Sequence, residues 1–112
     1  MKILAIAASA LVAITIAVAA EPEHDKPDPR DFGPDHIDVS RYPAPQQKTY
    51  DVYAVKCAKC HPLARSVNAR FNSTDWKRYM KRMIRRPNSG INEEQAAAIY
   101  EFLKYHAAQL GL

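Results

Sequence analysis

The stretch K-C-A-K-C-H-P, residues 56–62, contains both cysteines of the chain, and a histidine directly follows the second. Two thiols separated by two residues can form a disulfide, act as a redox-active pair or bind a metal ion. The adjacent histidine adds a fourth chemistry. In a C-x-x-C-H motif the two thiols form thioethers with the vinyl groups of a porphyrin, and the imidazole binds its iron.

The first three chemistries each lack a supporting feature. A Cys57–Cys60 disulfide closes so short a loop that it stabilises a small domain little. A thioredoxin-type pair belongs beside a βαβ pattern, and no segment shows sustained alternation. A structural zinc site needs a fourth ligand, and none of the other histidines supplies a convincing one. We therefore interpret Cys57, Cys60 and His61 as the attachment site of one covalent haem c, with His61 as an iron ligand.

The first residues have the features of an export signal. Lys2 precedes an unbroken apolar run, and Ala17-Val18-Ala19 forms a small-x-small cleavage site. We predict a secretory signal peptide over residues 1–20 and a periplasmic location for the rest of the chain. The alternative is an uncleaved membrane anchor, since residues 3–20 approach the roughly 18 to 20 that span a bilayer. Membrane contact is expected only in that case.

The remaining chain divides by composition. Residues 21–48 contain six prolines, seven acidic residues and four basic residues, with few large apolar side chains. Such a segment buries too little surface to offset its ordering entropy, so we predict an extended, largely disordered tether. Residues 49–112 contain eleven basic and five acidic residues, a net charge of about +6, and form the predicted domain. Domains this small usually need a staple, a role that a covalent haem can fill.

Three helices are predicted in that domain, and no strand. Residues 47–59 carry an apolar stripe with helical spacing that ends in the cysteine motif. A second helix starts after a Ser73 or Thr74 cap and stops before Pro87. A third starts at an Asn92–Gln95 capping box and runs to about residue 109. We therefore predict an all-α fold.

The second and third helices are amphipathic. The third carries an apolar stripe made by Ile99, Phe102, Leu103, His106 and Leu110. The apolar face of the second helix consists of Trp76, Tyr79, Met80, Met83 and Ile84. Its opposite face is basic and consists of Lys77, Arg78, Lys81, Arg82, Arg85 and Arg86. This face is either solvated surface or a docking surface for an acidic partner protein. No nucleic-acid partner is expected.

The second axial position of the iron decides between electron transfer and reactions that need an open site. Met80 and Met83 both lie on the apolar face of the second helix, where methionine is commonly core filler. Met83 is nearer the turn that starts at Pro87, where the chain can wrap a haem edge, so it is the favoured sixth ligand. The alternatives are Met80, an open position, or one of the other histidines, which are His24, His36 and His106. Arg65 and Arg70, which follow the motif, are candidate partners of the haem propionates.

Four patterns within residues 49–105 resemble the class I c-type cytochromes, in particular the small bacterial monohaem kind. They are Tyr53 four residues before Cys57, the motif Cys57-Ala58-Lys59-Cys60-His61, the helix pattern Ile99-x-x-Phe102-Leu103, and Trp76-x-x-x-Met80-x-Arg82-Met83. The last is similar to the W-x-x-x-V-x-R-M signature of small periplasmic c domains, whose final methionine is the sixth ligand. The resemblance implies about three helices wrapped around one haem, with His61 and Met83 as its iron ligands.

The resulting functional expectation is a periplasmic carrier of single electrons between a protein donor and a protein acceptor, at least one of which has an acidic docking surface. We expect no enzymatic activity of its own. One alternative is a haem subunit of a larger periplasmic or membrane-bound redox enzyme. The other is a haem sensor or peroxidase with an open sixth position.

Overall fold

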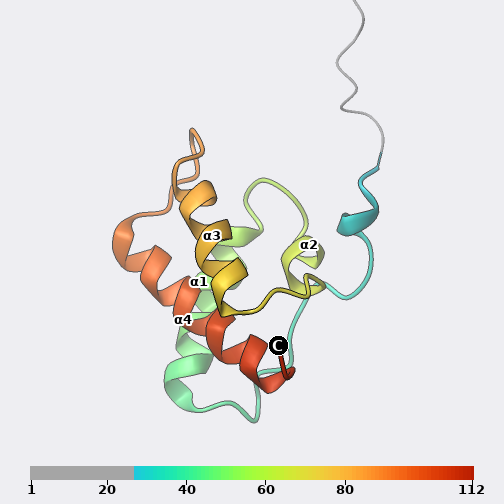
Figure 1. The fold of residues 1–112 in the computed structure, drawn as a ribbon, viewed down its shortest axis with the longest axis vertical. Helices are drawn as coiled ribbons and strands as arrows, with labels where there is room; N and C mark the ends of the chain where they lie inside the picture. Colours follow the sequence, from blue (N-terminus) through green and yellow to red (C-terminus); the bar gives the residue numbers. More distant parts are fainter. Residues whose placement is uncertain (1–26) are drawn as a thin grey trace, which may run out of the picture.

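Residues 27–112 are described by a computed structural model of the chain and are all-helical (Figure 1). They form η1 (Pro29–Asp31), α1 (Ala44–Cys57), α2 (Ala64–Val67), α3 (Ser73–Ile84) and α4 (Glu93–Gln109), with no strand among them. The predicted all-α class is confirmed for this part of the chain. The predicted signal peptide, residues 1–20, lies outside the described residues. Within residues 27–112 no helix has the length and apolar character needed to cross a membrane.

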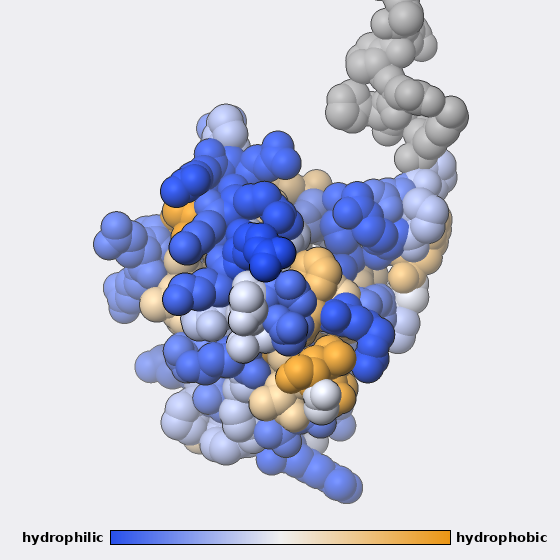
Figure 2. Space-filling view, in the orientation of Figure 1, coloured by the Kyte–Doolittle hydropathy of each residue, from blue (hydrophilic) through white to orange (hydrophobic). Residues whose placement is uncertain are grey.

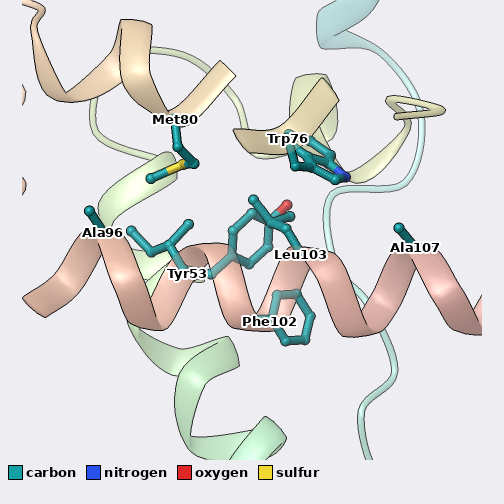
Figure 3. Close-up of a cluster of buried hydrophobic side chains, with 8 residues drawn as sticks. Tyr53, Trp76, Met80, Ala96, Phe102, Leu103 and Ala107 are labelled. Atoms are coloured by element: carbon teal, nitrogen blue, oxygen red, sulfur yellow. The ribbon is translucent and has the colours of Figure 1, made fainter. Parts of the chain in front are cut away.

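The long C-terminal helix α4 packs against both α1 and α3 (Figure 1). Tyr53 of α1 and Phe102 of α4 form the centre of this arrangement, with stacked rings 5.1 Å apart between centroids. The buried side chains around this contact come from three helices (Figure 3) and are Tyr53, Trp76, Met80, Ala96, Ile99, Phe102, Leu103 and Ala107. The predicted stripe of α4 is therefore buried at its centre, whereas Leu110 at its end is exposed.

The helix boundaries agree with the predictions in part. The capping box at the start of α4 is confirmed, because Asn92 and Gln95 exchange both expected hydrogen bonds. The prediction of Ser73 or Thr74 as the cap of α3 is wrong. Asn72 accepts the hydrogen bond from the Asp75 N–H and begins the helix one residue earlier. The short helix α2 was not predicted from the sequence.

The first helix starts earlier than expected, at Ala44. Pro45 fits there because the first turn of a helix has no intrahelical partner for its N–H groups. The predicted boundary between tether and domain, at residues 48 and 49, therefore falls inside α1. The part of the predicted tether that precedes α1 within the described residues is also placed against the helices.

This segment, residues 28–43, is here called the N-terminal strap. Its acidic start is bound to α2, because Arg65 donates two hydrogen bonds to Asp31 at 2.6 and 2.8 Å. Further along, the Ile37 N–H donates to the Tyr50 hydroxyl at 3.1 Å. Three apolar side chains of the strap pack against the core and are Ile37, Val39 and Tyr42. The disordered tether predicted from composition thus differs from the arrangement found over these residues, where a few spaced contacts fix the chain.

The end of the strap contacts α4 through a hydrogen bond 2.7 Å long between the Tyr42 hydroxyl and Nδ1 of His106. The His106 ring also stacks on Phe102. Burial lowers the pKa of His106. In the neutral ring Nδ1 can accept a hydrogen bond from the Tyr42 hydroxyl, whereas in the protonated ring both nitrogens are donors.

We predict that this contact makes stability depend on pH. Because the pKa of His106 is lower in the folded than in the unfolded state, the unfolded state binds the extra proton first as pH falls. The free energy of unfolding should therefore be highest above the unfolded pKa of about 6.5 and fall as pH decreases through the folded pKa. Chemical denaturation at several pH values measures this slope. His106→Gln should flatten it and the exposed control His36→Gln should not; equal slopes in all three proteins would contradict the assignment.

Candidate functional site

A cavity of about 840 Å³ lies beside the hydrophobic core. Its size is within the range of about 300 to 1,000 Å³ that is usual for small-molecule and cofactor sites. The cysteine motif, α2, α3 and the loop between α3 and α4 all contribute to its wall. The lining includes all four predicted haem-binding residues, which are Cys57, Cys60, His61 and Met83.

The two cysteines are free thiols in different surroundings. Cys57 is the last residue of α1, and burial raises the pKa of its thiol to about 12. Cys60 lies in the turn after the helix and is exposed. Reactive redox cysteines have a lowered pKa, often at a helix N-terminus. Cys57 has the opposite position and the opposite shift, so the geometry does not favour a thioredoxin-type pair.

His61 has a buried ring nitrogen, Nδ1, with no hydrogen-bond partner among the described residues. A buried polar atom without a partner costs stability, so a histidine with only a packing role would usually have one. His61 lines the cavity, and it directly follows Cys60 in the sequence. Because Nδ1 is buried, a ligand held in the cavity would meet the other ring nitrogen, Nε2. Within residues 27–112, no group of three or more His, Cys, Asp or Glu residues is arranged to hold a bare metal ion.

The two methionines of α3 both reach the cavity but differ in burial. Met80 is 4% exposed and belongs to the hydrophobic core, where it points toward α4 near Ala96 (Figure 3). Met83 is half-buried, lines the cavity and is not part of that core. Core packing therefore accounts for the position of the Met80 side chain but not for that of Met83.

Two of the histidines considered as rival ligands, His36 and His106, are not at the cavity. His36 is exposed and lies 3.2 Å from the carboxylate of Asp35. His106 bonds to Tyr42. Neither lines the cavity, and His24 lies outside the described residues.

The polar part of the cavity wall is basic. The charged residues of the described part of the chain that line it are Arg30, Lys56, Arg65, Arg82 and Arg86, and residues 27–112 contribute no acidic side chain to the lining. Arg65 is already paired with Asp31, and Arg70 is exposed and does not line the cavity. Arg82 and Arg86 have no ion pair among residues 27–112, and Arg82 lies over the Tyr79 ring at 5.6 Å. These two arginines are therefore better placed to meet an anionic group than the pair that the sequence suggested.

The loop between α3 and α4, residues 85–92, covers part of the cavity with Pro87, Ser89 and Ile91. Two lysines from the region of the cysteine motif contact its backbone. Lys56 donates to the Gly90 carbonyl and Lys59 to the Asn88 carbonyl. Sequence reasoning missed these contacts. The turn residues 87–90 indicate a loop, but no local pattern identifies its partners.

A buried hydrogen bond connects α1 to α2 behind the motif. The Tyr53 hydroxyl lies 2.7 Å from Oγ of Ser66, and Ser66 lines the cavity. Ser66 Oγ itself donates to the Leu63 carbonyl at 3.1 Å. Its single proton is thus engaged, so Tyr53 is the donor of the shorter bond. The sequence analysis did not identify Ser66 either. It singled out Tyr53 by its spacing from Cys57, but no sequence pattern indicates which residue bonds to the Tyr53 hydroxyl.

Comparisons of the chain with protein-family models, with curated proteins and with solved structures each found no match. The interpretation of the site therefore depends on its residues and geometry.

We predict that Tyr53 and Ser66 are energetically coupled. Tyr53→Phe removes one buried hydrogen bond and should lower the free energy of unfolding by about 0.5 to 1.5 kcal/mol. Ser66→Ala removes the same bond together with the one to the Leu63 carbonyl, so it should cost at least as much. The double variant should cost less than the sum of the two. Denaturant titration of the four proteins measures the coupling. Additive losses would mean that the 2.7 Å contact contributes little.

Proposed function

We propose that this chain is an exported monohaem c-type cytochrome that transfers single electrons between periplasmic redox partners. The observation that carries the proposal is the convergence of Cys57, Cys60, His61 and Met83 on one cavity. These residues come from the end of α1, the following turn and the distal half of α3. A haem c needs two thiols, an imidazole and, for electron transfer, a second axial ligand.

Each of these residues would have a separate role. Cys57 and Cys60 would hold the cofactor through two thioethers, and His61 would bind the iron from the motif side. Met83 would supply the sixth ligand, whereas Met80 would remain part of the core. Support for the fit comes from the position of His61 in the cavity wall and from the lining itself, to which residues 27–112 contribute no acidic side chain. The free arginines Arg82 and Arg86 suit the two carboxylates of the porphyrin.

A haem bound here would supply a one-electron Fe(III)/Fe(II) couple. The surrounding side chains set the conditions for that couple. Apolar and aromatic residues of the wall, including Phe71, Trp76 and Ile91, limit water and lower the local dielectric. Both this environment and a thioether ligand favour the less charged Fe(II) state, so the potential should exceed that of a bis-histidine haem.

The finer fold expected from the resemblance belongs to the same proposal. The α1–α4 contact through Tyr53 and Phe102 supports a class I cytochrome arrangement, in which the first and last helices cross and α3 with its loop faces the haem. Four helices, counting the short α2, would replace the three that the sequence suggested.

We predict that the two methionines have separable effects. Met83→Ala should abolish the near-infrared charge-transfer band of methionine-ligated Fe(III), lower the one-electron potential and open the iron to CO or cyanide. Met80→Ala should keep the band but lower the free energy of unfolding by about 2 to 5 kcal/mol, because it leaves a void in the core.

Absorption spectroscopy, voltammetry and denaturant titration together measure these effects. An intact near-infrared band in the Met83→Ala variant would show that Met83 is not the sixth ligand. Rapid CO binding to the reduced wild-type protein at neutral pH would instead favour a sensor or peroxidase with an open sixth position.

The basic surface of α3 supports the partner proposal. Figure 2 shows hydrophilic side chains gathered over this helix. All six predicted basic residues of α3 and its C-terminal end are exposed and are Lys77, Arg78, Lys81, Arg82, Arg85 and Arg86. A redox carrier needs fast and short-lived encounters, and complementary charge raises the association rate without requiring a large interface. We propose that at least one partner docks an acidic surface here.

We predict that electron transfer with this partner slows as ionic strength rises, because salt screens the attraction. Lys77→Glu/Lys81→Glu reverses two charges that do not line the cavity. This variant should have a lower second-order rate at low salt and a weaker salt dependence, with an unchanged haem spectrum. Lys48→Glu on α1 is the matched control. Stopped-flow rates indifferent to salt and to the α3 reversal would mean that the face is only solvated surface.

A further inference from the structure

The loop after α3, residues 85–92, has few contacts with the core. It starts two residues after Met83 and contributes Arg86, Pro87, Ser89 and Ile91 to the lining. Of these four only Ile91 packs against the core. Interactions other than core packing must therefore hold the rest of the loop in place.

Two lysine side chains provide such a hold. Lys56 Nζ donates to the Gly90 carbonyl at 3.1 Å, and Lys59 Nζ donates to the Asn88 carbonyl at 2.8 Å. Both lysines flank Cys57, and Lys59 lies between the two cysteines. Hydrogen bonds from a charged donor are stronger than neutral ones, so two of them on one short loop are significant even when partly solvated.

The loop backbone is shaped for these contacts. Asn88 and Gly90 have φ angles of 62° and 66°, in the left-handed region that favours glycine and asparagine. A Cβ atom at Gly90 would lie 2.8 Å from Nζ of Lys59. The backbone conformation therefore favours glycine at position 90, and a side chain there would displace the end of Lys59.

Met83 is connected to this loop at its start. The Arg86 N–H donates to the Met83 carbonyl at 3.1 Å, and the Ser89 N–H donates to the Arg86 carbonyl at 3.2 Å. The side chain of Met83 is not anchored in the core. Its position against the cavity thus depends on the end of α3 and on the turn that follows.

We propose that Lys56 and Lys59 are positioning residues that fix the loop to the haem-attachment motif and thereby keep Met83 directed into the cavity. This inference rests on the proposed function. It assigns to two lysines beside the cysteines the task of keeping the sixth ligand bound. The segment that contains the two cysteines would then also hold the α3–α4 loop in place.

The test is the rate at which cyanide displaces the sixth ligand in the oxidised holoprotein. Lys56→Met/Lys59→Met keeps the apolar stems but removes both donors, and should bind cyanide about tenfold faster than wild type, as loss of two such hydrogen bonds implies. Gly90→Ala disturbs the same contact from the loop side and should act in the same direction. Lys59→Arg keeps a charged donor and should stay near the wild-type rate. Lys48→Met is the control for loss of an exposed lysine on α1.

Two further readouts separate positioning from general stability. The near-infrared band of the double variant should be present at low temperature and fade at a lower temperature than in wild type, while the denaturation midpoint stays close to that of Lys48→Met. An unchanged cyanide rate in a protein with intact haem and band would overturn this inference alone. A midpoint that falls enough to explain the faster rate would also overturn it. A wild-type protein without covalent haem would overturn the proposed function and this inference with it.

Discussion

A hydrophobic core that ends at a cavity is the constraint on which the rest of this structure depends. Eight buried side chains join α1, α3 and α4, and a space of about 840 Å³ is lined by two of them, Trp76 and Met80, and by residues of the cysteine motif and the α3–α4 loop. A domain of this size rarely gains enough stability from side chains alone. The helices therefore form one side of a core whose other side we assign to a covalently attached porphyrin.

Several polar contacts join the elements around the cavity to one another. Arg65 connects α2 to the strap, Tyr53 connects α1 to Ser66, and Lys59 connects the motif to the loop. Each such contact adds about a kcal/mol or less at an exposed position and somewhat more when buried. They orient the wall rather than supply its stability. This division explains why Met80, which the core holds, and Met83, which it does not, have different proposed roles.

Features that depend on interactions between residues close in the sequence were predicted well, and features that depend on distant residues were not. Helical periodicity and the Asn92–Gln95 capping box depend on neighbours within one or two turns, so α3 and α4 were predicted nearly to their ends. The strap was predicted as disordered because composition counts apolar residues but does not register spaced contacts such as Tyr42 with His106, 64 residues away. Residue type and spacing singled out the motif and Met83, and these residues line one cavity. The partners of the two lysines were not, since a backbone carbonyl carries no sequence signal.

Covalent haem content tests the central claim most directly. The full chain, produced in a host that attaches haem to C-x-x-C-H proteins, is denatured, extracted with acidified organic solvent and measured by intact mass and by absorption. We predict one haem per chain that survives extraction, at most one thioether in Cys57→Ala or Cys60→Ala, and no cooperative unfolding in the haem-free double variant. A haem-free wild-type chain that carries a Cys57–Cys60 disulfide and unfolds cooperatively would contradict the account.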